Sequence, residues 1–512
     1  MPDKDEKSGD NSVGEEHDAS TPLNPKEEQS ADQDPEAPVV RDNRVELKKN
    51  VTLLSGISFI VGTVIGSGIF VSPTGILVTS KSIGLSLIVW LGCGVLAMLA
   101  SLCYTELGTA VPKSGAEYAY LMKAFGPIPA FLFAWTGIVI NRPAICAIVS
   151  LIFAEYVAKP FFLECKPPEA VIKLLGLSCI VVVTGINCWS VRWATRVQRI
   201  FTYAKLLCIA LLVIIGVVEL CRGRTENLQN AFEGSETDPA TIGFAFYIGL
   251  WAYDGWNSLN YCTEEMKNPS RDMPRAIMIG ISLVTACYLI VNVAYITVLG
   301  GSGILASEAV AVSIGNAYLG PVNWIIPLFV AASTFGTVNG VAFTSGRLTY
   351  VAARDGLLPS LLAMIQVKRL TPLPSMLLTS TIAIIMVIPP GSNFMNLVGF
   401  FSFAAWLFYG GSFAALLWLR YKEPNMPRPY KVPIVVPIFM LFASTYLVIA
   451  PIVAKPVGSL IALLIVIAGL PFYFFFKSNL VPQWFRNAID SFTYESQKLF
   501  NIAETEPSDE SS

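Results

Sequence analysis

The sequence predicts an all-α polytopic membrane protein with twelve transmembrane helices. Of its 512 residues 54% are hydrophobic and 14% are charged, which is too little charge to cover the surface of a soluble protein of this length. The apolar residues also form blocks of about twenty, separated by short charged stretches, as membrane helices do. These blocks cover residues 51–78, 84–110, 126–158, 171–190, 199–221, 240–262, 275–299, 322–346, 372–390, 396–419, 432–454 and 457–476.

Two polar ends flank the twelve-span domain, which we place at residues 46–478. Residues 1–45 are acidic and poor in apolar side chains, so we expect a disordered tail. Residues 479–512 begin amphipathically and end acidic, which predicts a short helix on the membrane surface followed by an acidic tail. With the N-terminus inside, the inner loops hold about sixteen Lys and Arg against about six outside, which predicts that both termini are cytoplasmic.

The first span is interrupted by the stretch VGTVIGSGIFVSP at residues 61–73. One interpretation is close helix packing through Gly62 and Gly66, which have small-xxx-small spacing. The other is a discontinuous helix that unwinds at Gly66, Ser67 and Gly68 near mid-membrane. The bared N–H groups and the positive end of the second half-helix would then bind a carboxylate.

A second interruption lies five spans later, in GLWAYDGWN at residues 249–257. Gly249 and Gly255 bracket two aromatic residues and the charged Asp254 within an apolar span. Interrupted first and sixth spans are what a five-plus-five inverted repeat predicts. The pair therefore favours the discontinuous helix and predicts a ligand site between the two spans.

The motifs GTVIGSGIFVSP, LCYTELGTAVPKSGAEYAY, GLWAYDGWNSLNYCTEEMKNP and FTSGRLTYVAARDGLLP resemble the L-type amino acid transporters, the light chains of heteromeric amino acid transporters. The resemblance covers about residues 46–500 and lies within the amino acid–polyamine–organocation superfamily. It implies a LeuT-like fold and sodium-independent exchange of amino acids in the plasma membrane. It also implies a disulfide to a single-pass glycoprotein heavy chain.

Within that family, WAYDGWN, KPPEAVIK and FSFAAWLFYG look most like members that exchange cationic amino acids and cystine for neutral ones. This likeness implies an rBAT-like heavy chain and the apical membrane of an epithelium. Exchange restricted to neutral amino acids and proton-coupled transport remain the alternatives.

An amino acid substrate offers a carboxylate and an ammonium group. The carboxylate suits the N–H groups of the first interruption, with the Ser67 hydroxyl as a further donor. The ammonium needs acceptors, for which we expect backbone carbonyls near Ile65 and in residues 250–253. Trp251 matches a position that the family uses as an outer gate, although it could equally be a packing aromatic. The residues expected to bind substrate are Ile65, Gly66, Ser67, Gly68, Trp251, Ala252, Asp254, Gly255 and Asn257.

Three of the charged residues inside the predicted spans bear on the expected site. An ionised Asp254 carboxylate in mid-membrane would cost several kcal/mol of free energy unless it is paired. Its partner is the side chain of a cationic substrate, or else Arg142 or Lys205. Lys205 aligns with a family lysine whose ammonium takes the place of a sodium ion; the alternatives are proton coupling and a structural pair. Arg142, beside Pro143, is expected to face the helix bundle.

Ten cysteines are present, and most lie within apolar spans. Cys165 and Cys221 lie near the outer face, where they bond to each other, stay free, or pair with another chain. The resemblance implies that Cys165 bonds to the heavy chain. The sequence has no Cys/His cluster and no catalytic motif, so we predict no metal, no cofactor and no enzymatic activity.

Overall fold

The structure is a computed structural model that describes residues 39–41, 44–46, 52–111, 115–162, 165–307, 309–354, 356, 358–369, 371–454, 456–477 and 483–504. The chain divides into two units, residues 1–48 and 49–512. In the first unit, strands β1 (Val39–Arg41) and β2 (Arg44–Glu46) pair antiparallel. The tail predicted to be disordered falls, for residues 1–38, outside the described part of the chain.

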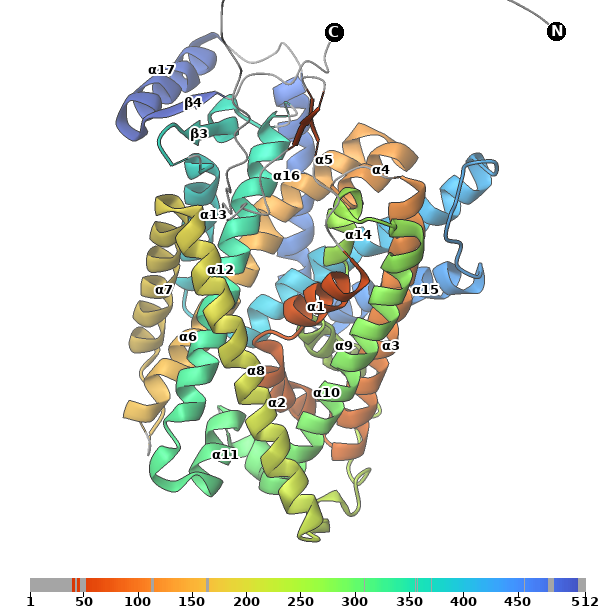
Figure 1. The fold of residues 1–512 in the computed structure, drawn as a ribbon, viewed down its shortest axis with the longest axis vertical. Coiled ribbons are helices and arrows are strands. Elements are labelled where there is room, and N and C mark those ends of the chain that lie inside the picture. The colour runs from red at the N-terminus through yellow and green to blue at the C-terminus, as the bar shows by residue number, and fades with distance from the viewer. Residues whose placement is uncertain are drawn as a thin grey trace, which may run out of the picture. The chain divides into compact units, whose positions relative to one another are not determined.

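The second unit is a helical bundle (Figure 1). Within the described residues, nine helices are long and apolar enough to cross a membrane, or ten if one bent pair counts as a single span. Two of the predicted spans contain shorter helices, α9 and α13. The α-helices are α1 (Leu53–Val64), α2 (Gly68–Ser80), α3 (Ile83–Ala110), α4 (Glu117–Phe125), α5 (Pro127–Thr136), α6 (Arg142–Ala158), α7 (Glu169–Trp189), α8 (Val191–Cys221), α9 (Pro239–Ala252), α10 (Pro269–Ala306), α11 (Val310–Tyr318), α12 (Ile325–Arg354), α13 (Leu373–Val387), α14 (Phe394–Lys422), α15 (Val435–Ala454), α16 (Pro456–Lys477) and α17 (Gln483–Phe500). Shorter helical turns are η1 (Gly137–Asn141), η2 (Lys159–Phe161), η3 (Glu226–Leu228), η4 (Ser258–Glu265), η5 (Gly320–Val322) and η6 (Ser360–Ala363).

Several helices begin at side chains that cap the free N–H groups of a first turn. Asp238 accepts from the Thr241 N–H at 2.9 Å at the start of α9, and Asn393 accepts from the Asn396 N–H at 3.0 Å at the start of α14. Proline occupies the first position of α9 and α10, where its missing N–H costs nothing. Local sequence thus fixes where these spans start.

A π-helical turn interrupts the segment that runs from α5 into α6. The turn is η1, and it ends directly before Arg142 and Pro143. Single π turns within α-helices are frequent at functional sites because they turn side chains out of the regular helical register. Regular α-helical hydrogen bonding in this segment is therefore interrupted directly before Pro143.

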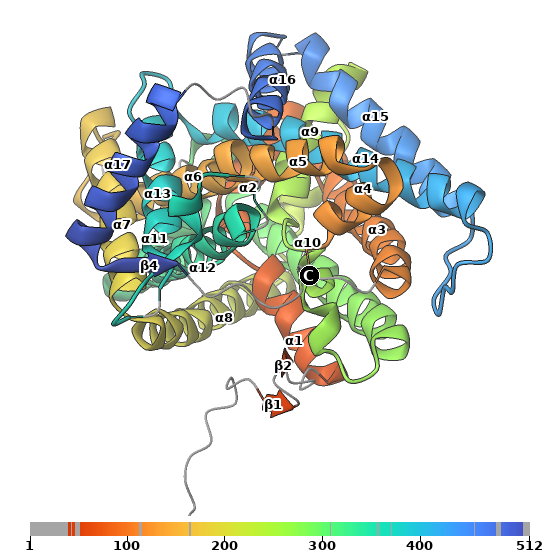
Figure 2. The ribbon, with the colours of Figure 1, turned by 90° about the horizontal axis from the view of Figure 1, so that it is seen from above.

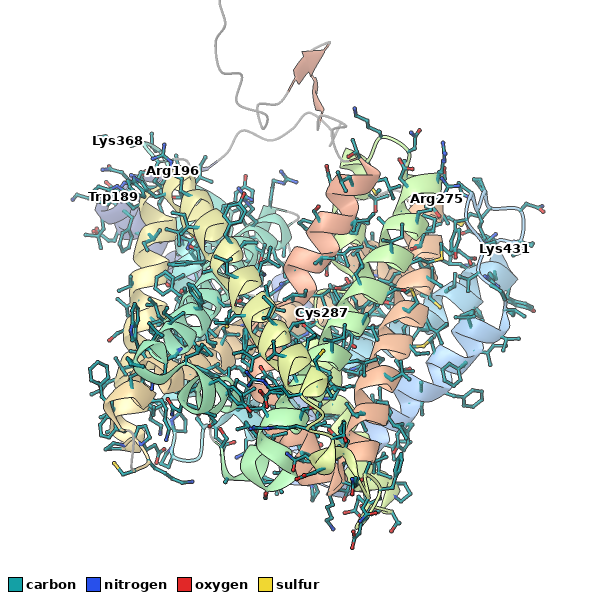
Figure 3. The ribbon with its side chains drawn as sticks, turned by 60° about the horizontal axis from the view of Figure 1, so that its bottom comes forward. Trp189, Arg196, Arg275, Cys287, Lys368 and Lys431 are labelled. Carbon is teal, nitrogen blue, oxygen red and sulfur yellow. The ribbon has the colours of Figure 1, made fainter. Side chains whose placement is uncertain are left out.

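Basic residues gather at one end of the bundle. Figure 3 shows Arg196, Arg275, Lys368 and Lys431 at the same end of the helices, whereas Cys287 lies along their length. This distribution agrees with the predicted basic face of a membrane protein.

The C-terminal segment forms helix α17, which contacts strand β4 and overlies α7 and α13 in the view of Figure 2. A two-stranded ladder that the sequence did not indicate follows it. Strand β4 (Ile502–Glu504) pairs antiparallel with β3 (Met364–Gln366), and Ile365 lies opposite Ala503. The acidic end predicted after it, at residues 505–512, falls outside the described residues.

Candidate functional site

Helical winding stops in the first apolar segment at Ile65. The Ile65 N–H still bonds to the Val61 carbonyl at 3.0 Å, but its ψ of 96° leaves the helical region. Winding resumes at Gly68, and the axes of α1 and α2 differ in direction by 53°. Within the described chain, the N–H groups of Ser67 and Gly68 donate to no residue. Two buried donors are thus available at the start of α2, where the helix dipole favours negative charge.

Helix α9 ends at Ala252, within the predicted sixth span. A turn follows in which Gly255 has a φ of +96°, a conformation that L-residues with a side chain rarely adopt. The chain then continues as the 3-10 helix η4 instead of an α-helix. Regular α-helical winding therefore also ends inside the apolar stretch predicted as the sixth span.

The two interruptions lie against each other. A Cβ atom on Gly68 would meet the Ala252 Cα at 2.5 Å, and one on Gly255 would meet the Thr63 Cγ2 at 2.8 Å. The Tyr288 hydroxyl, from α10, lies 2.8 Å from the Val64 carbonyl oxygen and 3.0 Å from that of Ala252. Glycine at these positions allows close backbone approach, and Tyr288 supplies a donor to the carbonyls of both helix ends.

The alternative of close packing through Gly62 and Gly66 is wrong in this chain. A Cβ on Gly62 would meet nothing within 4 Å, and one on Gly66 would meet only the nearby Val64 carbonyl, at 3.8 Å. The glycine at the close contact is Gly68.

The carbonyls expected to hold the ammonium are only partly open. The Leu250 and Trp251 carbonyls accept from the Tyr253 and Asp254 N–H groups at 3.2 and 3.1 Å. The Ala252 carbonyl lies in reach of Tyr288. Each of these oxygens keeps at least one lone pair. An ammonium at residues 250–253 would therefore share the Leu250 and Trp251 carbonyls with these N–H groups, and its binding there stays a prediction.

Trp251 is buried and packs edge-on against Phe394, at the start of α14, with ring centroids 5.1 Å apart. Such T-shaped pairs stabilise a fixed arrangement of two helices. The contact joins the end of α9 to α14 directly beside the interruption.

Asp254 and Glu117 bring two carboxylates to the same part of the bundle. The positive charge of Arg142 acts on both of them, and the Tyr409 hydroxyl donates to Asp254. Glu117 is fully buried, and accepts from Asn257 Nδ2 at 2.5 Å and from the Tyr261 hydroxyl at 2.6 Å. Among the described residues this cluster pairs two acidic groups with one guanidinium.

Glu117, Tyr261, Tyr288 and Tyr409 are site residues that the sequence did not indicate. Glu117 lies in the quoted SGAEYAY motif, where an isolated carboxylate within an apolar context was a usable signal. The tyrosines have no such signal, because buried aromatics are common in any core.

Lys205 is buried in α8, and its Nζ donates to the Gly62 carbonyl at 2.5 Å. The lysine therefore contacts α1 just before the interruption, and it forms no ion pair with Asp254. That removes Lys205 as the structural partner of Asp254.

The remaining predicted residues lie at the surface. Cys165 and Cys221 are both exposed and carry free thiols, so they do not bond to each other. In the part of the chain that the structure describes, no three His, Cys, Asp or Glu side chains gather as a metal site would require.

A helical membrane protein with two interrupted helices in contact, orphan backbone donors and buried charges has the features of a multi-pass transporter. The chain belongs to the amino acid permease family, whose profile matches residues 51–476. It is 51% identical over 431 residues to the human b(0,+)-type amino acid transporter 1, covering 84% of this chain and 88% of that protein. It is 45% identical over 461 residues to the rat large neutral amino acids transporter small subunit 2 (89% and 86% covered). To the human cystine/glutamate transporter it is 41% identical over 464 residues (90% and 92% covered).

Proposed function

We propose that the chain is a sodium-independent amino acid exchanger of the plasma membrane, which takes up cationic amino acids and cystine in exchange for neutral ones. The family and the names of the relatives support amino acid exchange. The interruption between α1 and α2, in contact with the end of α9, is the observation that carries the proposal. We propose that these helices are the broken first and sixth spans of a twelve-span, LeuT-like inverted repeat.

The substrate carboxylate binds at the start of α2. The N–H groups of Ser67 and Gly68 lack partners within the described chain, and buried N–H groups without acceptors are costly. A carboxylate satisfies them and is stabilised by the helix dipole. The Ile65 carbonyl and the second lone pairs of the carbonyls at 250–252 accept from the substrate ammonium.

The charge balance of the site favours a substrate with a cationic side chain. The Arg142 guanidinium acts on two carboxyl groups, Asp254 and Glu117, so the chain supplies a positive charge for at most one of them. An uncompensated charge in a low-dielectric interior is expensive, and a bound arginine or lysine side chain neutralises it. An occupied site is therefore electrostatically complete, which suits a transporter that reorients only when it is loaded.

The Lys205 ammonium, bound to the Gly62 carbonyl, supplies a fixed positive charge beside the first interruption. We propose that it takes the place of a sodium ion, so that exchange needs no sodium gradient. Uptake measured in sodium-free buffer tests this: equal rates with and without sodium are expected, and dependence on sodium contradicts it.

Exposed Cys165 lies between η2 and α7, where a second chain can reach it. We propose that it forms the disulfide to an rBAT-like glycoprotein heavy chain, with both termini of the light chain cytoplasmic.

The Asp254→Asn variant tests the specificity. Arginine and lysine uptake should fall roughly tenfold or more, because the carboxylate that pairs with their side-chain charge is lost, whereas leucine uptake should change little. Competition uptake in proteoliposomes measures both.

The control is Asp272→Asn, the same chemical change in the first turn of α10, away from the site. This control variant should leave the uptake of arginine, lysine and leucine unchanged. Equal losses of arginine, lysine and leucine uptake in Asp254→Asn would show that Asp254 has a structural role only. Amino acid exchange itself would remain supported by leucine exchange in that case.

A further inference from the structure

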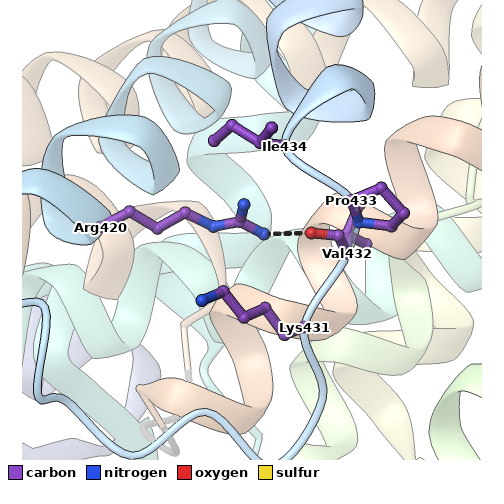
Figure 4. Close-up of a pocket in the computed structure, with 5 residues that line it drawn as sticks. All are labelled: Arg420, Lys431, Val432, Pro433 and Ile434. Atoms are coloured by element: carbon purple, nitrogen blue, oxygen red, sulfur yellow. Dashed lines mark hydrogen bonds between the residues drawn. The ribbon is translucent and has the colours of Figure 1, made fainter.

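A basic pocket lies between the end of α14 and the start of α15. It has a volume of about 490 Å³ and is lined by Arg420, Lys431, Val432, Pro433 and Ile434 (Figure 4). None of these residues belongs to the site described above.

One wall of the pocket is held rigidly by Glu106, which is fully buried at the end of α3. Its carboxylate accepts from Arg420 Nε at 2.8 Å, from Arg420 Nη2 and from the Val432 N–H at 2.8 Å. Arg420 Nη2 also donates to the Val432 carbonyl at 2.6 Å. The guanidinium of Arg420 is therefore preorganised, and ligand binding need not order it.

The other amino group of Arg420, Nη1, donates to no residue in the described chain, although the side chain is only 11% exposed. Figure 4 shows it turned away from the Val432 carbonyl, and the Lys431 ammonium on the same side of the loop. Lys431 forms no ion pair with a described residue. Arg428 adds a third cation, 3.6 Å from Glu106. The lining of the pocket thus contains two cations, Arg420 and Lys431, and no carboxylate, so the pocket carries surplus positive charge.

An exposed apolar stripe starts at the same place and follows α15. Ile434 and Val435 adjoin the pocket, and Ile438, Phe439 and Phe442 continue the stripe at helical spacing. In a membrane these side chains face lipid acyl chains.

We propose that the pocket binds the headgroup of an anionic phospholipid, whose acyl chains lie along the exposed face of α15. The basic end fits a phosphate and a further negative charge, and the adjoining stripe fits the chains that a free phosphate lacks. The end of the bundle that carries Lys431 is the one we propose to be cytoplasmic, where anionic lipids are concentrated. The inference rests on that orientation and is independent of the amino acid site.

Native mass spectrometry of the full-length protein, purified in detergent, tests the proposal with added phosphatidylserine, phosphatidylcholine or inorganic phosphate. Wild-type protein should retain phosphatidylserine in preference to phosphatidylcholine. Lys431→Gln should weaken phosphatidylserine binding about fivefold, the worth of one basic residue at an anionic lipid, whereas Lys431→Arg should retain it. Lys422→Gln is the control, because Lys422 is equally exposed at the end of α14 but does not line the pocket.

Equal phosphatidylserine retention by wild type and Lys431→Gln overturns the proposal, as does equal retention of phosphatidylserine and phosphatidylcholine. Retention of inorganic phosphate that displaces the lipid assigns the pocket to a soluble anion and overturns the lipid as its occupant. If Lys422→Gln and Lys431→Gln lose equal amounts of phosphatidylserine binding, the effect comes from general surface charge, which overturns the proposed lipid site. Leucine exchange by Lys431→Gln reports whether the variant is folded.

Discussion

At the scale of residues, the site depends on a few groups that compensate for backbone left without helical partners. The Tyr288 hydroxyl is the clearest of them, because it lies within hydrogen-bond distance of the Val64 and Ala252 carbonyls at once. A hydroxyl has a single proton, so it donates to one of the two at a time. It therefore joins the ends of α1 and α9 without fixing them permanently to one arrangement.

Replacing Tyr288 with Phe removes this donor and leaves both carbonyls buried. The free energy of unfolding should fall by about 1–3 kcal/mol, the cost of an unsatisfied buried polar group. Thermal unfolding in detergent measures it, with Tyr203→Phe as the control, since Tyr203 is exposed on α8. Identical stabilities of the two variants would mean that Tyr288 does not support the helix ends.

The local sequence indicates some of these residues and gives no sign of others, for a physical reason. The Gly66–Gly68 stretch and Asp254 stand out because glycines and charges are costly within a membrane helix. Glu117 and Tyr288 come from distant helices, and only the packing of those helices brings them to the interruption. Tertiary proximity of this kind leaves no local pattern in the sequence.

At the scale of elements, the first apolar segment combines two glycines with opposite surroundings. Gly68 begins α2 in direct contact with Ala252, whereas Gly62 has open space where a side chain would lie. The interruption was predictable because Gly and Pro punctuate helices. The π turn before Arg142 and the 3-10 winding of η4 were not, since both depend on what packs around them.

The pair Gly68→Ala and Gly62→Ala separates these roles. Gly68→Ala should lower the free energy of unfolding by about 1–3 kcal/mol, because the new methyl group overpacks the contact with Ala252. Its exchange of every amino acid should also fall sharply. Gly62→Ala should be neutral or stabilising by up to about 1 kcal/mol, since alanine favours helix over glycine. Uptake assays measure the exchange, and thermal unfolding measures the stability, of the two variants. Normal transport by Gly68→Ala would show that close approach of α2 and α9 is dispensable.

At the scale of the whole molecule, composition alone predicted a polytopic helical protein, and the family comparison and the helical bundle confirm this class. The count of twelve spans stays a prediction, because α9 and α13 are shorter than a full crossing. A partner chain leaves only indirect traces in the sequence and structure of a single chain, such as an exposed thiol. Its identity therefore depends on comparison with relatives.

The proposed disulfide between Cys165 and a heavy chain can be tested on the assembled complex. Co-expression with an rBAT-type glycoprotein should yield a large complex on a non-reducing gel that reductant dissolves. Cys165→Ser should abolish the covalent complex, whereas Cys221→Ser, at the other exposed thiol among the described cysteines, should preserve it. A covalent complex that survives Cys165→Ser would assign the bond to another cysteine.

The central claim is that the interruptions beside Gly68 and Ala252 bind the head group of an amino acid. A cryo-electron microscopy map of the protein with saturating arginine tests it most directly. We expect density for the α-carboxylate within hydrogen-bond distance of the Ser67 and Gly68 N–H groups, and for the guanidinium beside Asp254. Arginine density elsewhere, with α2 and α9 packed together and no ligand between the interruptions, would contradict the account.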